Sequence, residues 1–181
     1  MSIVEELYNK IDDGREGKNV GLKTGLPKLD FYTGGMKKGV YSLYFSKSSV
    51  GKTSLVIYRL YRILKDYPDK DIMIVYFSLE LGASTLLAKL LSLYIEETFG
   101  VELTYMQLLS FIDKLTDEQY QYVQQAQDWL ESISKKFIIY DKQLSADSFY
   151  AEMMELHKSL GTFNKVKRDI RNKMISLGLN E

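Results

Sequence analysis

The stretch Ser46-Lys47-Ser48-Ser49-Val50-Gly51-Lys52-Thr53 decides how the rest of this 181-residue chain is interpreted. It follows a strand-like apolar run, residues 40–45, and precedes a helix-like run, residues 54–60. A strand, a tight turn that ends in Gly-Lys-Thr and a helix form the setting of a phosphate-binding P-loop. Backbone N–H groups converge at the start of such a helix, where the helix dipole also favours an anion. The sequence therefore predicts a phosphate site here, and an ordinary strand-to-helix turn is the alternative.

Individual positions of this stretch carry the predicted chemistry. Lys52 is expected to reach the terminal phosphates, and the Thr53 hydroxyl is expected to bind Mg²⁺. Ser46 replaces the first glycine of the general pattern GxxxxGK[ST]. Either Ser46 holds a turn conformation that glycine adopts at lower cost, or the loop differs at its start.

Composition excludes several classes of site. Basic and acidic residues balance at 24 each, so DNA binding would need local patches rather than an overall positive field. The chain has no cysteine, which excludes disulfides, thiolate catalysis and cysteine-bound zinc, and its single histidine excludes a histidine triad. The N-terminus lacks a signal-peptide pattern and no apolar run has membrane-spanning length. We therefore expect a cytoplasmic protein that does not enter a membrane.

The first 20 residues are predicted to form an amphipathic arm and a linker. Apolar residues recur at helical spacing between Ile3 and Ile11, and residues 12–19 form a polar, glycine-containing linker. An isolated helix of this length is marginal in water. Its apolar stripe is therefore expected to dock, either on its own domain or on a neighbouring subunit.

From residue 21 onward, predicted strands and helices alternate. Turn signals on both sides of Leu29-Asp30 indicate a short helix that begins at Pro27. Apolar runs at residues 72–80 and 137–141 predict two further strands. Thr116 opens a capping box for one helix that extends through residue 133, and Ser145 caps the last helix. This order predicts an α/β fold, a doubly wound core with a largely parallel sheet in three α/β/α layers.

Three groups of residues resemble the RecA-like ATPase domain of DnaB-type replicative helicases, including phage versions. That family commonly has a P-loop of the form xRPSVGKT, so the missing first glycine supports the resemblance, and Ser48 stands where the family has proline. The resemblance extends from about Gly21 to about Phe163. The groups are Thr24-Gly25 through Leu29-Asp30 to Thr33-Gly34-Gly35-Met36, then residues 48–53, then Phe77-Ser78-Leu79-Glu80-Leu81.

The resemblance implies a RecA-like P-loop NTPase core that binds ATP and Mg²⁺, forms a hexameric ring and moves on single-stranded DNA. Residue by residue, it assigns nucleotide binding to residues 46–53, with Lys52 on the phosphates and Thr53 on the metal. It assigns to Glu80 the polarisation of the attacking water. A lysine, a metal and one water-orienting carboxylate are the minimum set for phosphoryl transfer. The alternative for Glu80 is an ordinary exposed carboxylate at a strand end.

The family's Walker B strand, which ends in an aspartate that holds Mg²⁺ through water, has no counterpart after Phe163. The register of the resemblance places residues 137–141 on the preceding strand, and the alternative is that Asp141 is the Walker B aspartate. The favoured register implies a partial ATPase domain, residues 21–163, between the arm and a basic tail, residues 164–181. The tail either contacts DNA phosphates or forms a solvated amphipathic helix. An incomplete sheet is expected to self-associate or to require a complementing chain.

Three functions of different classes agree with these observations. The first is a helicase motor segment that couples ATP hydrolysis to movement on single-stranded DNA. The second is a separate P-loop nucleotide-binding protein, such as a small kinase or a regulator, although an arginine-rich lid is lacking. The third is a non-catalytic fragment that joins helicase rings through its N-terminal arm.

Overall fold

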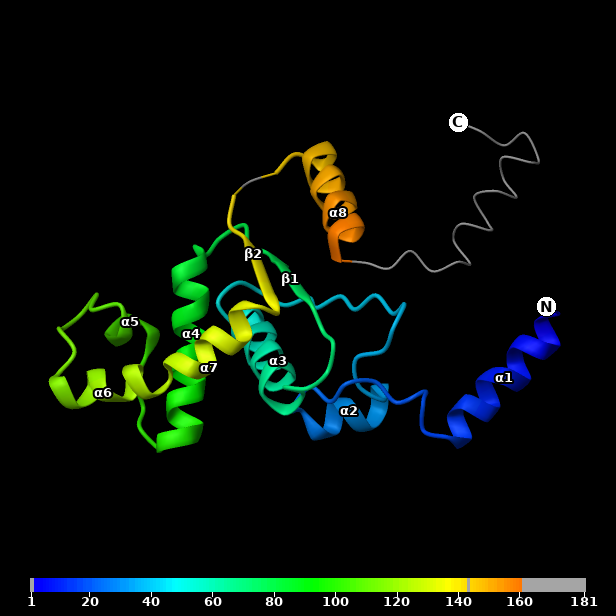
Figure 1. Cartoon of the computed structure of the whole chain (residues 1–181), viewed down its shortest axis with the longest axis horizontal. Helices are drawn as coiled ribbons and strands as arrows, with labels where there is room; N and C mark the ends of the chain where they lie inside the picture. Colours follow the sequence, from blue (N-terminus) through cyan, green and yellow to red (C-terminus); the bar gives the residue numbers. More distant parts are fainter. Residues whose placement is uncertain (1, 143, 161–181) are drawn as a thin grey trace. The chain divides into compact units, whose positions relative to one another are not determined.

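The computed structural model describes residues 2–142 and 144–160. The chain divides into two compact units, with the boundary between Asp141 and Lys142. The first unit contains helices α1 to α7 and both described strands, and the second contains α8 (Figure 1). The stretch that resembles a P-loop lies in the first unit, directly before α3 (Lys52–Asp66).

In the described residues, the sheet consists of two parallel strands, β1 (Ile74–Phe77) and β2 (Phe137–Tyr140). Ile74 lies opposite Phe137, and Phe77 lies opposite Tyr140. Aromatic and β-branched side chains favour such strands because they pack well on a pleated surface. The rings of Phe77 and Tyr140 stack with their centroids 4.9 Å apart. Both strands were predicted from the sequence and are confirmed, with shorter ends.

The main core lies where α3, α4 (Ala83–Phe99) and α7 (Gln127–Ser134) pack on the sheet (Figure 1). Tyr61 of α3 and Leu86 and Leu90 of α4 are at most 1% exposed. Burial of one such side chain contributes about 1.5–3 kcal/mol. This packing fixes α3 against the strands and against α4. The buried members of the core are Ile57, Tyr61, Leu64, Leu86, Leu90, Ile133 and Phe137.

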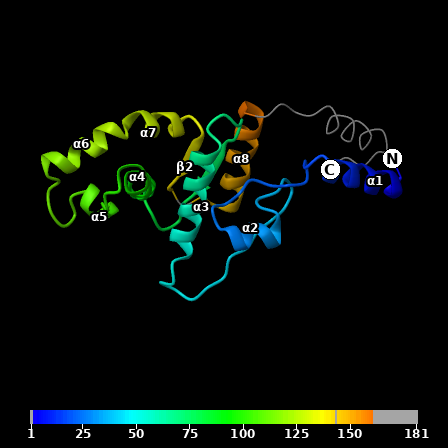
Figure 2. The same cartoon turned by 90° about the horizontal axis from the view of Figure 1, so that it is seen from below.

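A second apolar cluster joins α4 to α5 (Tyr105–Leu108) and α6 (Asp117–Gln125), which lie beside it in Figure 2. Thr116 forms the predicted capping box with Gln119, which confirms the start of α6. The single helix predicted from residue 117 to residue 133 is wrong, because the chain breaks at Ala126 into α6 and α7. Ala126 is fully buried at this break. Tyr122 and Trp129 pack against these two clusters, whereas Tyr120 is exposed.

The N-terminal segment contains α1 (Ile3–Arg15) and α2 (Pro27–Thr33). No residue of α1 is buried. The linker predicted to begin at residue 12 is wrong for its first four residues, because the helix continues to Arg15. A capping box between Ser2 and Glu5 and side-chain pairs along the helix favour that length. Pro27 begins α2 and the left-handed Gly34 ends it, both as predicted.

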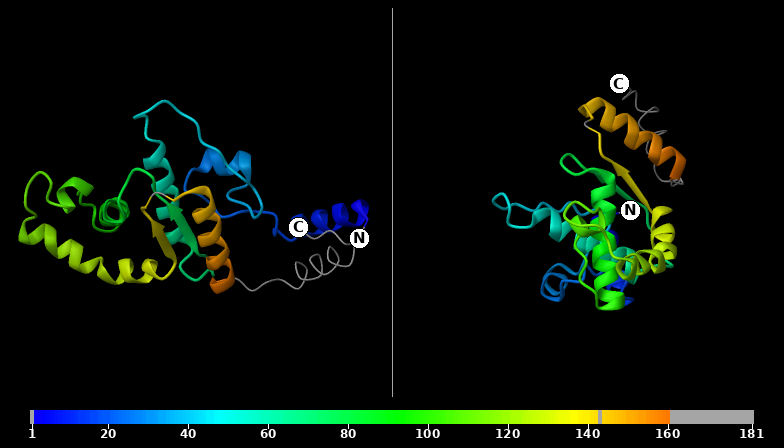
Figure 3. Two further views of the ribbon diagram at one scale, coloured as in Figure 1. Left: turned by 90° about the horizontal axis from the view of Figure 1, so that it is seen from above. Right: turned by 90° about the vertical axis from the view of Figure 1, so that its left-hand side faces the viewer.

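Residues 40–45, the approach segment, were predicted as a strand, and this prediction is wrong for the structure. No backbone hydrogen bond joins them to another part of the described chain. Figure 3 shows the loop between α2 and α3 running clear of β1 and β2. The segment is apolar enough for a strand, but a strand needs a neighbour to receive its hydrogen bonds. Tyr41 and Phe45 are consequently more than 80% exposed.

The second unit contains α8 (Ala146–Leu160) in its described part. Ser145 precedes the helix, and its hydroxyl accepts a hydrogen bond from the Ser148 N–H group at 3.2 Å, so the predicted cap is confirmed. The predicted end of the domain at residue 163 and the predicted basic tail of residues 164–181 lie outside the described residues.

Candidate nucleotide-binding site

The loop before α3 has the backbone of a tight turn that opens onto a helix. Gly51 is the N-cap of α3 with φ +92°, a left-handed conformation that glycine adopts at little cost. Ser49 also has a positive φ, +62°. Ser46 does not, so of the two possibilities for this position the loop itself differs from the general pattern. The non-glycine residue of the loop with a strained backbone is Ser49, three residues after the position of the pattern's first glycine.

Unpaired backbone donors gather in this loop. Within the described chain, no N–H group of residues 48–54 donates a hydrogen bond, and the first such bond is from Leu55 to the Gly51 carbonyl at 2.8 Å. The first N–H groups of any helix lack intrahelical acceptors. Here the unpaired donors extend back into an exposed loop, and several N–H groups at the positive end of the helix dipole can receive one anion.

Lys52 folds back over the loop that it ends. Its Nζ donates hydrogen bonds to the carbonyl oxygens of Ser46 and Lys47, each at 3.2 Å. An ammonium group has three donors, so one remains for another acceptor. The structure thus brings together three of the predicted binding residues, Ser46, Lys47 and Lys52, in one closed turn.

Thr53 lies in the first turn of α3 and is half-buried, whereas residues 46–52 are exposed. Its hydroxyl makes no hydrogen bond to any described residue. In the described part of the chain, no group of three or more His, Asp or Glu side chains is placed to hold a metal ion. A hydroxyl can supply one ligand to Mg²⁺, whose remaining ligands are commonly waters and phosphate oxygens.

Glu80 follows β1 and is exposed. The turn that carries it is fixed by Ser78, whose buried hydroxyl donates to the Leu81 carbonyl at 2.5 Å and accepts from the Leu81 N–H group at 3.1 Å. Burial, together with the charge of Glu80, raises the pKa of Tyr76 on β1. In the described residues, no hydrogen bond or ion pair joins Glu80 to Lys52 or Thr53.

Asp141 ends β2 next to the carboxyl end of β1. Its Oδ2 accepts a hydrogen bond at 3.0 Å from the N–H group of Ala83, the first residue of α4. Gly82, the N-cap of α4, has no side chain to satisfy this donor. Asp141 thus serves as a helix cap supplied from the neighbouring strand, which sequence reasoning had not considered.

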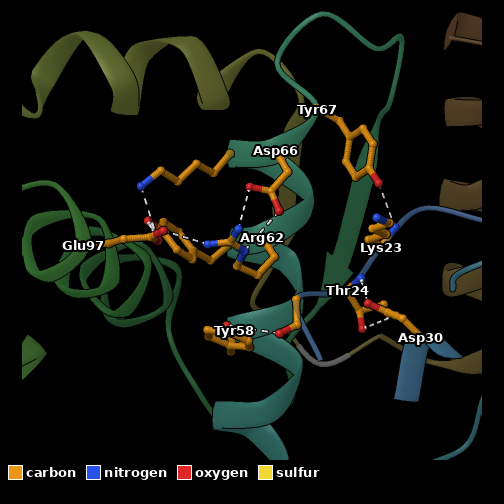
Figure 4. Close-up of polar contacts among 11 residues, drawn as sticks. Lys23, Thr24, Asp30, Tyr58, Arg62, Asp66, Tyr67 and Glu97 are labelled. Carbon is orange, nitrogen blue, oxygen red and sulfur yellow. Dashed lines mark hydrogen bonds and ion pairs between the residues drawn. The ribbon is translucent and has the colours of Figure 1, made fainter. Parts of the chain in front are cut away.

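A polar network holds the C-terminal half of α3 against α4 (Figure 4). Glu97 accepts hydrogen bonds from the Tyr61 hydroxyl at 2.5 Å and from Arg62 at 2.8 Å. Lys65 forms a further ion pair with Glu97 at 3.3 Å. The hydrogen bond from Tyr61, followed by those from Arg62 and Lys65, lowers the pKa of Glu97, and burial raises that of Tyr61.

The residues Thr24-Gly25 and Asp30 that carry part of the family resemblance anchor the N-terminal segment to α3. The fully buried Thr24 donates its N–H and hydroxyl groups to the Asp30 carboxylate at 2.9 and 2.7 Å (Figure 4). A Cβ atom on Gly25 would lie 2.3 Å from Cγ of Arg62. Only glycine allows this close approach, and its φ of +77° also favours glycine. These residues therefore hold the N-terminal segment against α3, the helix that follows the loop, and no described hydrogen bond joins them to the loop itself.

Comparison with known proteins identifies the family. A model of the DnaB-like helicase C-terminal domain matches residues 21–167, most of the chain. The chain belongs to this family. Its relatives include the replicative DNA helicases DnaB of two Helicobacter pylori strains, J99 / ATCC 700824 and ATCC 700392 / 26695. They are 30% identical to it over 167 and 146 residues, which cover 88% and 78% of this chain but 31% and 27% of the relatives.

The predicted resemblance to DnaB-type helicases is thus confirmed. A DnaB-like C-terminal domain implies a RecA-like fold, and the parallel pair β1–β2 with its packed helices is compatible with part of that fold. The chain spans about a third of the length of the curated relatives it matches. In the residues described, no helix has the length and apolar character needed to cross a membrane.

Proposed function

We propose that this chain is the ATP-binding segment of a DnaB-type replicative helicase, which couples ATP hydrolysis to movement on single-stranded DNA. One observation carries the proposal: the closed turn of residues 46–52 presents unpaired N–H groups and the Lys52 ammonium at the start of α3. Membership in the DnaB-like family supports the same assignment. In this assignment residues 1–20 are an arm, residues 21–163 a partial RecA-like domain and residues 164–181 a basic tail.

In the proposed mechanism, the loop N–H groups and Lys52 bind the phosphates of ATP, and the Thr53 hydroxyl is a ligand of Mg²⁺. Mg²⁺ supplies charge neutralisation on the phosphate oxygens when it is bound. Glu80 accepts a hydrogen bond from the attacking water and orients it toward the terminal phosphate. This role requires the turn after β1 to lie near Lys52, so the approach segment must join the sheet in the active assembly. Asp141 is then a helix cap, and its role as the Walker B aspartate remains the alternative.

The active assembly is proposed to be a ring, hexameric as in the family, completed by further copies or by a complementing chain. The unpaired approach segment and the two-stranded sheet support a need for additional strands. Such strands would complete the three-layer α/β/α arrangement.

A second function, that of a non-catalytic fragment which joins helicase rings, is favoured by α1. This helix has no buried residue, and its five apolar side chains are all at least 48% exposed. An amphipathic helix of 13 residues gains little stability alone and buries its stripe on a partner.

The decisive experiment measures MgATP binding and hydrolysis by the 181-residue chain, with and without single-stranded DNA. Lys52→Ala is expected to weaken binding at least about tenfold, since it removes a charged phosphate contact. Lys38→Ala, which removes an exposed lysine outside residues 46–53, is the matched control and should bind normally. Glu80→Gln should bind MgATP but lose turnover.

Three outcomes decide between the functions. Turnover that single-stranded DNA stimulates supports the motor. Binding without stimulation by DNA supports a separate nucleotide-binding protein. Equal affinity of the wild type and Lys52→Ala would refute the P-loop assignment, and inhibition of a complete helicase by this chain would then support the interaction fragment.

A further inference from the structure

Arg59 is a buried cation that forms no ion pair with a described carboxylate. It lies two turns into α3 and is 6% exposed. Within the described residues it forms no ion pair with a carboxylate, and its Nε has no hydrogen-bond partner. Burial lowers the pKa of its guanidinium, and the charge of Asp30 opposes that shift. A buried charge without a paired carboxylate is costly, so an apolar residue here would favour stability and the arginine requires another explanation.

Its contact is with the approach segment. Nη1 of Arg59 donates a hydrogen bond to the Tyr44 hydroxyl, and the guanidinium carbon lies 5.0 Å from the centre of the Tyr44 ring. Tyr44 is half-buried, whereas the other residues of the approach segment are exposed. Since no backbone hydrogen bond holds this segment, the pair Arg59–Tyr44 is its attachment to α3 in the part of the chain that the structure describes.

The loop of residues 46–51 therefore has two anchors on the same helix. At one end the chain continues into Lys52, whose Nζ bonds to the Ser46 and Lys47 carbonyls. At the other end, two residues before Ser46, Tyr44 is held by Arg59. The distance that the loop must bridge is thus set by two positions on α3, residues 52 and 59. A loop whose two ends are fixed on one rigid helix keeps its N–H groups in one arrangement.

We propose that Arg59 is a positioning residue for the loop: by holding Tyr44 against α3, it fixes the arrangement of the N–H groups that receive phosphate. The inference rests on the proposed function of the loop, which it deepens. The contact is a charge-assisted hydrogen bond combined with a cation–π contact, and both are stronger when shielded from water. Arg59 itself does not touch the phosphates.

If Arg59 served only the stability of the fold, its loss would lower stability without a specific loss of MgATP binding. Arg62 provides the matched control for this alternative. Arg62 lies three residues further along α3 and bonds to Asp66 and Glu97, away from the loop. Arg59→Met and Arg62→Met both remove an arginine from the same helix and retain an unbranched apolar side chain. Loss of Arg62 should lower thermal stability without a change in MgATP affinity. Loss of Arg59 should weaken MgATP binding with a smaller effect on stability.

The experiment compares the full chain with Arg59→Met, Arg59→Lys, Tyr44→Phe and Arg62→Met. MgATP dissociation constants are measured by titration calorimetry and unfolding by urea. The mobility of the approach segment is measured without nucleotide from a spin label on Leu43→Cys, an exposed position in a chain that has no other cysteine. We expect Arg59→Met to raise the dissociation constant about tenfold and to increase the mobility of the label at residue 43. Arg59→Lys, which keeps the charge, should restore part of both. Tyr44→Phe, which keeps the ring but removes the acceptor, should give an intermediate effect.

The proposal is overturned if Arg59→Met leaves both the dissociation constant and the mobility of the label at residue 43 unchanged, or if Arg62→Met changes them equally. Failure of the proposed function looks different. In that case the wild type and Lys52→Ala bind MgATP equally poorly, and the mobility of the label at residue 43, which is measured without nucleotide, still shows whether Arg59 holds the loop.

Discussion

The two ends of α3 are built in opposite ways. The C-terminal half carries a buried tyrosine, Tyr61, and a charged network with Glu97, and it packs against α4 and the sheet. The N-terminal end leaves its first N–H groups unpaired in an exposed loop. The two ends of this helix therefore have different roles. Its packed end supplies stability, and its open end retains the unsatisfied donors that an anion site requires.

The largest effect is expected from a change at the packed end. Leu86→Ala removes a fully buried side chain of α4 that belongs to the main core. We expect it to lower the free energy of unfolding by about 3 kcal/mol, the cost of lost burial plus a cavity. Leu79→Ala, at a position that is 75% exposed, is the control, with a change below about 0.5 kcal/mol. Urea unfolding measures both, and similar values would mean that this core does not hold the domain.

A smaller effect is expected at the open end. Gly51→Ala forces a Cβ onto a residue with φ +92°, where no atom lies within 4 Å of the added carbon. The cost is therefore purely conformational, about 1–2 kcal/mol. It should appear either as lost stability or as a rearranged loop with weaker MgATP binding.

Gly82→Ala is the matched control for that change. Its Cβ would also meet open space, but Gly82 has an ordinary φ of −64°. Because alanine is a poorer N-cap than glycine, we expect a loss of at most about 1 kcal/mol, smaller than at Gly51, and unchanged binding. If the two glycine variants behave alike in urea unfolding and in MgATP titration, the left-handed conformation at Gly51 is not required.

Glu97→Gln tests the network that closes the packed end. The change weakens the ion pairs with Arg62 and Lys65, and we expect a loss of about 1 kcal/mol, limited because the Glu97 side chain is 43% exposed. Glu96→Gln, at the neighbouring exposed position, is the control. MgATP affinity should not change, because the network lies away from the loop.

The same residue gives a pH dependence with a definite sign. The pKa of Glu97 is lowered from 4.5 by its hydrogen bond with Tyr61 and then by those with Arg62 and Lys65. Its charged form therefore stabilises the fold above the unfolded pKa, and this contribution is lost as pH falls below about 4.5 through the folded pKa. The difference in unfolding free energy between wild type and Glu97→Gln should shrink in that range. A constant difference down to pH 3 would contradict this assignment.

The smallest effect is expected from Ser49→Gly. The left-handed conformation costs serine more than glycine, but glycine loses more entropy on folding. We expect a net gain below about 0.5 kcal/mol. Ser110→Gly, the other described non-glycine residue with a positive φ, should show a similar gain. Only the change at Ser49 should alter MgATP affinity, because only Ser49 belongs to the loop.

Local chemistry made much of the fold predictable. Pro27 and Gly34 mark the ends of α2, Thr116 starts α6, and the apolar runs become β1 and β2. Those features depend on neighbours in the sequence. The strand prediction for the approach segment failed because a strand depends on a partner strand elsewhere in space. The residues of the segment do not specify that partner.

In the candidate site too, contacts between neighbours in the sequence were predictable and contacts between distant residues were not. The turn that Lys52 closes is formed by contiguous residues, so one motif in the sequence marked them as a group, and their binding role stays a prediction. The helix cap formed by Asp141 and the contact between Arg59 and Tyr44 join residues 58 and 15 positions apart. No local pattern indicates such pairs. A charged residue on the otherwise apolar face of α3 was the one available signal for Arg59.

The approach segment also has a consequence for how this chain behaves at high concentration. Its six residues combine aromatic and β-branched side chains with no charge and no proline, which is the composition of segments that assemble into cross-β aggregates. Lys37, Lys38 and Lys47 lie on either side of it. Flanking charges of one sign repel identical segments of other molecules, and salt weakens that repulsion. We therefore expect these lysines to oppose association of the segment with copies of itself at low ionic strength, and to do so less as salt is added.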